Sequence, residues 1–385
     1  MNKIFTQKSI LLISFILIFI SLIIVLSNVF SGNSLYVSPA SLYKPILPII
    51  LLLIFLERSF YNIKKNKYSN CISLENAPEE FENLYNSLYE NNIDILETRR
   101  KKIKLLIILQ NISLFFFILG IYAFDTVIIS PIITLIILFI AMISLPVAIL
   151  LFLHNSTLQK VYKNDYKINI INSFIQLLNC NLKYSPSATE ADSILHDYKL
   201  AIFDKQDFNS SYIDDYIEGY LDDSTFVKMC DINVQYITGE GKSKNIKDLF
   251  QGMFALTNSN TDIKTYVRIS RNQMMTSDKT YVELDNSEFE KHFDVFSPNK
   301  ILAMQILTSD VMECLIDFHN KYHLDFEITI RDNFIYLRFF TGSMFEPKIY
   351  GNSMDKQLLF TYFCISKFII EVTQKINRTL KDLEL

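Results

Sequence analysis

Four apolar segments occupy most of the first 153 residues, and no charged residue interrupts any of them. They cover residues 9–30, 45–56, 105–124 and 127–153. A helix that crosses a bilayer needs about 20 apolar residues, a length that three of the segments have. The second segment is short, so a crossing there would extend over 42–60, with Lys44 and Arg58 reaching toward the bilayer surfaces. The pattern predicts four transmembrane helices.

The first segment has one alternative, because Lys3 and Lys8 precede it as in a signal peptide. Its apolar run is longer than the ~7–15 residues of a signal core, and no small-residue cleavage site follows cleanly. We therefore predict an uncleaved membrane anchor.

Basic residues flank the loop between the second and third segments on both sides. They are Arg58, Lys64, Lys65, Lys67, Arg99, Arg100, Lys101, Lys102 and Lys104. Basic loops stay on the cytoplasmic side, so these residues set the topology. The prediction is a multi-pass protein of the bacterial inner (plasma) membrane with both termini in the cytoplasm and the lipid bilayer as a partner.

This topology divides the chain into four parts. They are a first hairpin at 1–60 (helices 9–30 and 42–60), a cytoplasmic loop at 61–104, a second hairpin at 105–153 and a cytoplasmic domain at 154–385. The loop should hold an amphipathic helix that begins near Pro78, since Phe81, Leu84, Tyr85 and Leu88 share one helical face. We expect this face to dock on the C-terminal domain or on a second copy of the chain.

The C-terminal part mixes helical and alternating patterns, which predicts an α+β domain with an antiparallel sheet, flanking helices and a long C-terminal helix. From His154 the chain is predicted to be helical to about Asn181, and a second helix ends at about Ile202. Further helices are predicted over 286–293, 298–323 and 355–380. Strands are predicted over 212–223, 226–237, 248–257, 263–270, 279–284, 325–331 and 334–340. The segment Tyr184–Ser187 is predicted to be a break between helices.

Composition narrows the function. The net charge of -4 gives no basic field for nucleic acid, so no nucleic-acid partner is expected. Transport is disfavoured because pathways usually need ionisable residues in the bilayer, whereas the third segment offers only Gln110 and Asn111. The five cysteines are far apart and odd in number, and in the cytoplasm they should be thiols.

Two motifs resemble binding sites. Gly239–Ser243 ends like a phosphate loop, but Tyr236 stands where the first glycine belongs and a strand should follow, so a hairpin turn is expected. His319 and His323 lie one helical turn apart, yet two ligands alone do not make a zinc site. No metal, cofactor or catalytic residue is predicted.

Charged residues near the predicted strands have two interpretations. The carboxylates Asp214, Asp215, Glu218, Asp222 and Asp223 could bind Mg²⁺ or Ca²⁺, although their spacing does not match a calcium loop. Most fall on the polar face of the strand, so a solvated face is expected. Arg268 and Arg271 could contact an anionic partner, but a solvated strand end is the expected interpretation.

Several ordered pieces of the chain are shared with a family. They are Val161–Lys163 after the second hairpin, Asp215–Gly219, Phe250–Phe254, Phe289–Val295, Ile306–Met312 and Phe345–Pro347. In these pieces and their order over roughly residues 80–380, the chain resembles the bacterial family called domain of unknown function 3137. The resemblance implies a membrane-anchored domain and no established activity. Physically, the glycine in Phe250–Phe254 should permit close strand packing with both aromatics on one face.

The leading hypothesis is a non-enzymatic scaffold or regulatory module at the inner membrane, which binds another membrane or cytoplasmic protein. A membrane-anchored enzyme or small-ligand receptor with its site in the α+β domain is the alternative, and a transporter component is a third. A deep apolar pocket would favour the receptor, whereas a broad apolar surface patch would favour the scaffold.

Overall fold

The computed structural model describes much of the chain from Ile72 onward. The described residues are 72–75, 77–125, 131–187, 191–202, 208–220, 225–239, 245–259, 261–271, 278–350 and 354–383. The predicted helices 9–30 and 42–60 lie outside them, as do Arg58, Lys64, Lys65 and Lys67. The chain divides into two compact units, which we describe separately. Glu97–Tyr162 and Lys348–Ser353 belong to the first, and Tyr68–Leu96, Lys163–Pro347 and Met354–Leu385 to the second.

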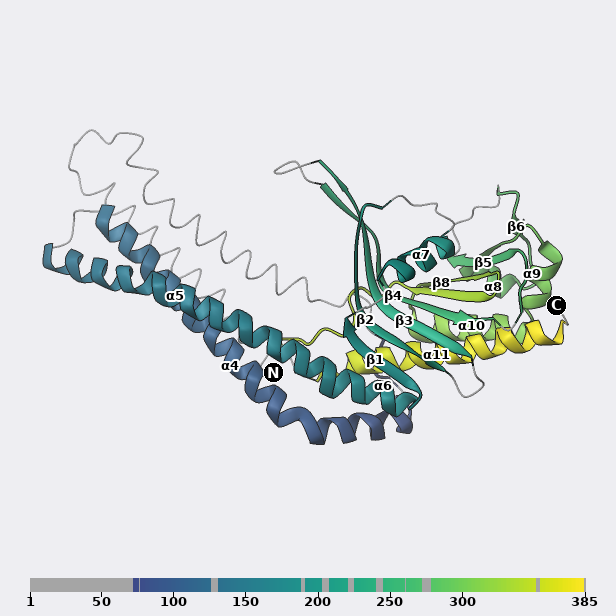
Figure 1. Ribbon diagram of the computed structural model, residues 1–385, viewed down its shortest axis with the longest axis horizontal. Coiled ribbons are helices and arrows are strands. Elements are labelled where there is room, and N and C mark those ends of the chain that lie inside the picture. Colours follow the sequence, from purple (N-terminus) through teal and green to yellow (C-terminus); the bar gives the residue numbers. More distant parts are fainter. Residues whose placement is uncertain are drawn as a thin grey trace. The chain divides into compact units, whose positions relative to one another are not determined.

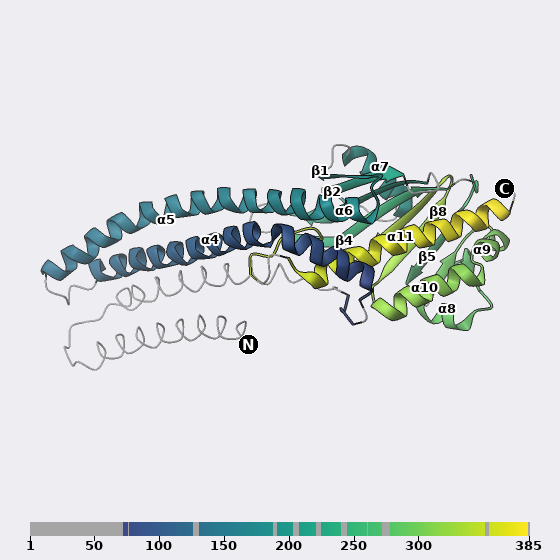
Figure 2. The ribbon, with the colours of Figure 1, turned by 90° about the horizontal axis from the view of Figure 1, so that it is seen from below.

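The first unit is built on two helices that lie side by side (Figure 2). They belong to α4 (Glu79–Asp125) and α5 (Pro131–Tyr166). The Ser113 hydroxyl of α4 donates a hydrogen bond of 2.6 Å to the backbone carbonyl of Ser144 on α5. Ala141, Ser144 and Ala148 are buried, and they follow one another at helical spacing. Small side chains therefore form the contact between the helices.

Both helices are longer than the sequence pattern predicts. The loop helix and the third apolar segment form the single helix α4, so no break separates them. Within the described residues, one helical stretch, Phe139–Leu178, is long and apolar enough to cross a membrane by length and composition. One such helix does not establish four crossings, which therefore stay a prediction.

The second unit is built on an antiparallel sheet, which in the described part of the chain has nine strands (Figure 1). The strands are β1 (Leu182–Ser187), β2 (Ser210–Tyr220), β3 (Phe226–Thr238), β4 (Asn245–Asn258), β5 (Tyr266–Arg271), β6 (Tyr281–Val282), β7 (Phe293–Phe296), β8 (Phe326–Arg331) and β9 (Phe334–Phe339). Their order across the sheet is β1-β2-β3-β4-β9-β8-β5-β7-β6. The predicted mixture of helices with an antiparallel sheet and a C-terminal helix is thus confirmed.

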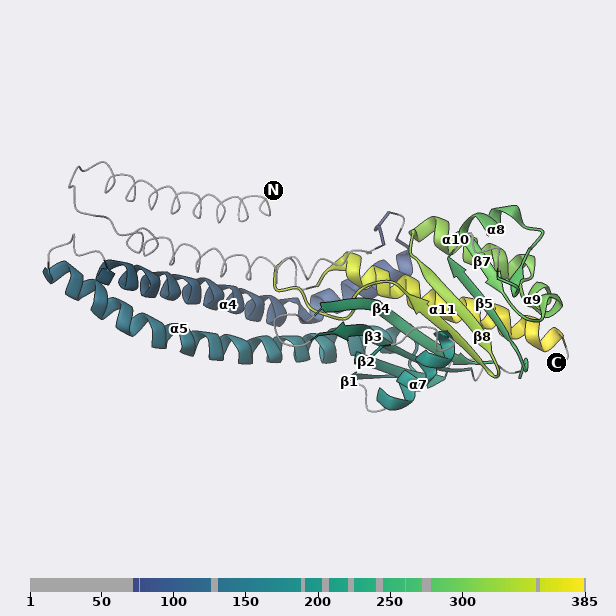
Figure 3. The ribbon, with the colours of Figure 1, turned by 90° about the horizontal axis from the view of Figure 1, so that it is seen from above.

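Helices cover both faces of this sheet. α7 (Ala191–Ile202) lies on one face (Figure 3), and α10 (Ser309–Tyr322) and α11 (Lys356–Asp382) run along the other (Figure 2). α8 (Ser287–His292) and α9 (Lys300–Ile306) lie beside α10. After α5 the chain passes through a π-helical turn, η1 (Lys167–Ile171), into α6 (Asn172–Leu178).

Aromatic side chains dominate the two cores. Under α7, Tyr198 packs on Phe250 and Phe254, with ring centroids 5.6 Å away in both cases. On the opposite face, Phe368 of α11 stacks on Phe318 of α10 at 3.9 Å between centroids. The second half of β4 and most of β8 and β9 thus bury both of their faces, which explains the scarcity of clean polar alternation there.

Gly252 lets β4 and β9 come together. A Cβ atom at this position would lie 1.9 Å from the backbone oxygen of Phe339. Phe250 and Phe254, two residues away on either side, both enter the core under α7. The predicted role of this glycine between two aromatics is confirmed.

The start of α4 packs on α11 within the second unit. Phe81 is fully buried, and its ring lies 4.9 Å from Phe360 and 5.5 Å from Phe363. The Tyr85 hydroxyl donates to the carbonyl of Met354. The prediction that the loop helix docks on the C-terminal domain is therefore confirmed.

Some element predictions were wrong in detail. The helix predicted over 298–323 is broken at Leu307, because the side chain of Thr308 caps a new helix by accepting from Val311 N–H. The predicted break at Tyr184–Ser187 is instead part of the edge strand β1, where Pro186 is tolerated. β7 was missed, since Phe293–Phe296 continues the apolar pattern of the preceding helix.

Candidate functional site

A bulge in β2 brings two adjacent carboxylates to the same side of the sheet. Asp214 pairs with Asp231 and Ile217 pairs with Met229. Two residues of β2, Asp215 and Tyr216, therefore lie opposite a single residue of β3. Asp215 has a φ of 56°, a left-handed conformation that Asp adopts more readily than most residues. The predicted alternation therefore ends here, and Tyr216 turns into the core under α7.

Both aspartates are buried, Asp214 at 8% exposure and Asp215 at 0%. The prediction that they belong to a solvated face is therefore wrong. The error arises because a strict two-residue period places Asp214 and Tyr216 together, whereas the extra residue separates them. Glu218 is half-buried on the same strand, and Asp222 and Asp223 lie outside the described residues.

Lys167 supplies the positive charge between the aspartates. Its Nζ lies 2.8 Å from Oδ2 of Asp214 and 2.7 Å from Oδ2 of Asp215. The side chain is 3% exposed and opens the π-helical turn η1. Such wide turns are rare and often occur at functional sites. A lysine that completes a buried ion pair was not singled out in the sequence, where it looked like one of several basic residues after the fourth apolar segment.

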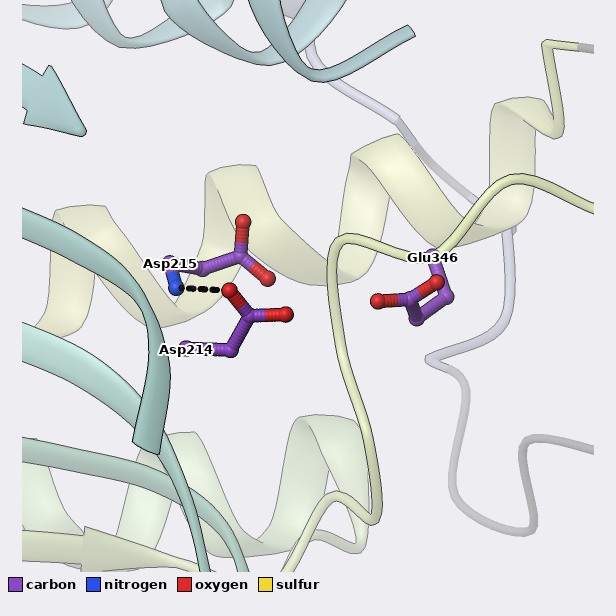
Figure 4. Close-up of side chains that lie close together, drawn as sticks. All are labelled: Asp214, Asp215 and Glu346. Atoms are coloured by element: carbon purple, nitrogen blue, oxygen red, sulfur yellow. Dashed lines mark hydrogen bonds between the residues drawn. The ribbon is translucent and has the colours of Figure 1, made fainter. Parts of the chain in front are cut away.

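A loop before α11 adds a third carboxylate (Figure 4). The side chain of Glu346 approaches the two aspartates from this loop, and its Oε1 lies 2.6 Å from Nζ of Lys163 and 3.6 Å from Nζ of Lys167. Phe345 holds the loop, since its ring stacks on Tyr362 at 4.4 Å and its N–H donates to the Tyr362 hydroxyl. The piece Phe345–Pro347 thus lies in the irregular segment that precedes the last helix.

Asp231 extends the cluster into β3. Its Oδ2 accepts hydrogen bonds from the Met344 N–H at 2.8 Å and from the Ser343 hydroxyl at 3.2 Å. Tyr184 of β1 donates its hydroxyl to Oδ1 of Asp215. We call Lys163, Lys167, Asp214, Asp215, Asp231 and Glu346 the buried ionic cluster.

Burial and the lysines shift the carboxyl pKa values in opposite directions. Burial is the largest influence on Asp215 and raises its pKa to about 7, against the opposing charge of Lys167. Burial likewise raises the pKa of Asp231 to about 8. For Asp214, burial is outweighed by the hydrogen bond and charge of Lys167, so its pKa falls. Burial and the neighbouring Asp215 raise the pKa of the Tyr184 hydroxyl.

A divalent cation is one group that such carboxylates can hold. Oxygens of Asp214, Asp215 and Glu346 lie within 4.8 Å of one another, close enough to share an ion. However, the ammonium of Lys167 already contacts all three carboxylates. We therefore regard the cluster as an internal salt-bridge network rather than a metal centre. Its burial also keeps solutes away from Asp215 and Lys167 in this conformation.

The other residues singled out in the sequence lie elsewhere. His319 contacts the ring of His292 at 4.8 Å between centroids, and His323 ends α10 in a left-handed conformation. Arg268 is mostly buried beside Glu327, whereas Arg271 is exposed and pairs with Asp325 at 2.8 Å. The prediction of a solvated strand end is therefore correct for Arg271 and wrong for Arg268.

The structure describes only part of the predicted hairpin turn and of the basic loop. Thr238 and Asn245 pair across β3 and β4, so a hairpin joins these strands, although residues 240–244 lie outside the described part. Among the topology-setting residues, Arg100 contacts Glu97 and Lys104 lies over the ring of Tyr350. These contacts do not test the predicted topology.

An open groove lies between α8, α9 and α10. It has a volume of about 460 Å³ and is lined by Leu284, Asp285, Asn286, Ser287, Glu288, Met304, Leu307, Ser309 and Met312. Both polar and apolar residues line it, and it is open to solvent. It is therefore not the deep apolar pocket that would favour a small-ligand receptor.

The fold and the cluster define a class of protein: a mixed helix-and-sheet domain, preceded by apolar helices, with a salt-bridge network inside. Residues 248–380 match the family described as "Protein of unknown function (DUF3137)". The resemblance to that family is therefore confirmed over these residues. The pieces Val161–Lys163 and Asp215–Gly219 lie before the match.

The chain is also similar to one solved structure, the mycobacterial trehalose monomycolate transport factor A. The identity is 8% and the TM-score 0.34, over 57% of this chain and 93% of that one. A similarity at this level defines neither a shared fold nor a shared activity. No curated protein sequence matches the chain.

Proposed function

We propose that the chain is a multi-pass inner-membrane protein with both termini in the cytoplasm, and that its second unit is a scaffold or regulatory module for another protein. The observation that supports membrane insertion is the apolar surface of the first unit. Along α5, Met142 is 67% and Leu150 65% exposed, while the small residues lie inside. A helix pair with large apolar side chains outside and small ones between is typical of a bilayer.

The exposed apolar residues extend over both helices. They include Leu105, Ile108, Leu109, Ile112, Phe116, Ile136, Phe139, Ile140, Met142, Ile143, Val147, Ile149, Leu150, Phe152 and Leu153. In water a patch of this extent would drive aggregation or association, whereas lipid chains solvate it. Lipid is therefore the environment that best explains this surface.

The topology is tested with reporter fusions at Leu385 of the full-length chain. A C-terminal GFP fusion should fluoresce, because the terminus is proposed to stay in the cytoplasm. An alkaline phosphatase fusion at the same place should be inactive. Membranes washed with alkaline carbonate should retain the protein, and its release would contradict insertion.

The scaffold assignment is supported by the enclosure of the charged groups. Asp215 and Lys167 contact each other out of reach of substrates, and the groove between α8, α9 and α10 is open and partly polar. A structural module with a binding surface accounts for these features better than an enzyme or a receptor with a deep site. Transport remains a third, less favoured role.

A pull-down tests this role. The tagged full-length protein is purified from its native host in mild detergent, and the eluate is analysed by mass spectrometry. A reproducible stoichiometric protein supports the scaffold role. A clean preparation without a partner would contradict it and favour a ligand-binding domain, which a thermal-shift screen of metabolites then examines.

A further inference from the structure

The buried ionic cluster contains more acids than bases. Four carboxylates (Asp214, Asp215, Asp231 and Glu346) face two lysines (Lys163 and Lys167), so four minus two leaves two excess negative charges if all groups ionise. Lys167 contacts three of the carboxylates, and Lys163 contacts Asp214 and Glu346. In the described part of the chain, the salt-bridge partners of the two lysines do not include Asp231.

Asp231 is held by neutral donors instead. The Ser343 hydroxyl and the Met344 N–H donate to its Oδ2, and Asp231 is 7% exposed. A buried carboxylate without an opposite charge is disfavoured, and proton uptake is the usual remedy. Asp215 is only partly compensated by an opposite charge, because Lys167, which it contacts, also forms a salt bridge with Asp214.

We propose that Asp215 and Asp231 form a proton-binding pair that fastens the end of the α5–η1 helix and the loop Ser343–Glu346 to β2 and β3. With the protons bound, Lys163 and Lys167 balance Asp214 and Glu346. When the protons leave, Asp215 and Asp231 add two negative charges inside, next to Asp214 and Glu346, and the helix end and the loop separate from the sheet more often. The proposal rests only on groups of the second unit and is independent of membrane insertion.

The groups around the pair come from every neighbouring element. They are Lys163 of α5, Lys167 of η1, Tyr184 of β1, Tyr212 and Asp214 of β2 and Glu346 of the loop. Tyr362 of α11 accepts from the N–H of Phe345, next to Glu346 in the loop. The two lysines favour the charged carboxylates, whereas Asp214 and Glu346 oppose them. Burial prevails, raising the pKa of Asp215 to about 7 and that of Asp231 to about 8.

The direction of the pH effect follows from linkage. An exposed aspartate in the opened state has a pKa near ~3.9, so between this value and about 7 to 8 only the closed state holds the protons. The closed state is therefore fully favoured at the acidic end, and its advantage is lost as pH rises through the folded pKa values. Above pH ~8 these two groups contribute no further change.

Hydrogen–deuterium exchange on the full-length chain in detergent micelles tests the proposal. After correction for intrinsic exchange, opening of residues 163–178 and 212–217 should increase with pH, up to about tenfold per pH unit for each linked proton. Asp215→Asn should remove part of this dependence, and Asp215→Asn with Asp231→Asn should remove nearly all of it. A dependence unchanged in the double variant would overturn the proposal.

Asp248→Asn is the matched control. Asp248 is exposed on the neighbouring hairpin and accepts from Gln235 at 2.6 Å, a bond that Asn can also accept. This variant should keep the wild-type pH dependence. If Asp248→Asn also lost the pH dependence of exchange, this dependence would arise from the protein's overall charge, and the proposal would be overturned.

Infrared spectroscopy of the wild type gives a second measurement that needs no variant to fold. A protonated carboxyl band from buried groups should be present near neutral pH and disappear as pH is raised through the window. A spectrum in which every buried carboxyl is already ionised at pH ~6 would contradict the proton-binding pair.

Discussion

Nζ of Lys167 lies 2.7 Å from Oδ2 of Asp215, and both side chains are almost completely enclosed. Replacing Lys167 by Met keeps the length of the side chain but leaves the aspartates without their ammonium. Removing one partner of a buried pair costs about 3–5 kcal/mol, so the free energy of unfolding should fall by this amount at pH ~8. The loss should be smaller at pH ~5, because Asp215, with its pKa raised to about 7, is then protonated.

Urea denaturation followed by circular dichroism measures this effect. Lys367→Met is the control, since the Lys367 side chain is 46% exposed and its ion pair with the exposed Glu80 should contribute less than about 1 kcal/mol. Equal losses in the two variants would argue against a special role for Lys167.

Phe81→Ala should release the first part of α4 from α11. The ring is fully buried between Phe360 and Phe363, and deletion of such a side chain costs about 3–5 kcal/mol. Limited proteolysis should then cut within residues 68–96 while the sheet stays resistant. Glu80→Gln removes only an exposed ion pair with Lys367 and should leave the cleavage pattern unchanged.

Ser144→Leu should weaken the contact between α4 and α5 in the first unit. The position is buried among small residues, and added bulk at a packed site costs about 1–3 kcal/mol. The melting temperature of the micelle-bound protein should fall. Met142→Leu changes an outward residue on the same helix, and a similar fall there would show that the helix surface, not the contact, was disturbed.

Gly252→Ala should destabilise the sheet. The new Cβ would meet the oxygen of Phe339 at 1.9 Å and the nitrogen of Thr341 at 2.9 Å, both of them backbone atoms. We expect a loss of roughly 2–4 kcal/mol, measured by chemical denaturation. Gly342→Asn is a useful contrast, because nothing lies within 4 Å of that Cβ and Asn tolerates its φ of 74°.

Thiol reactivity should separate the described cysteines into two classes. Cys180 is exposed, whereas Cys230, Cys314 and Cys364 are buried. Burial raises the pKa of Cys314 to about 12 and that of Cys364 to about 11, which suppresses their reactive thiolate. Brief iodoacetamide treatment with peptide mapping should label Cys180 first, and early labelling of Cys314 would contradict the packing of α10 on α11.

The sequence pattern predicted elements whose signal is local. The hairpin over 325–340 appears as β8 and β9, because Asp332 and Asn333 provide the turn between two apolar strands. The predicted helix 355–380 is α11, whose apolar run is buried in the core of the second unit. The docking of Phe81 also followed from spacing on one helix face.

The buried ionic cluster could not be predicted in the same way. Asp214 and Lys167 are 47 residues apart, and their contact depends on two local irregularities, a bulge in β2 and a π-helical turn. Periodicity assumes that neither irregularity occurs, so it assigned Asp214 and Asp215 to a solvated face. The one available signal was a pair of adjacent aspartates inside an otherwise apolar alternation.

The π-helical turn also limits how the chain can vary in length. Asn172 donates its N–H to the Lys167 carbonyl, five residues back, so this turn contains one residue more than an α-helical turn. Loss of a residue from a regular stretch of α5 would shift the helix on one side of the deletion by about 100° relative to the other. Loss of the exposed Asn169 would instead convert the wide turn into an ordinary one and leave the following helix nearly in phase. Phe174 and Ile175 would then stay in the core, so a single-codon deletion should harm the fold less here than in the regular part of the helix.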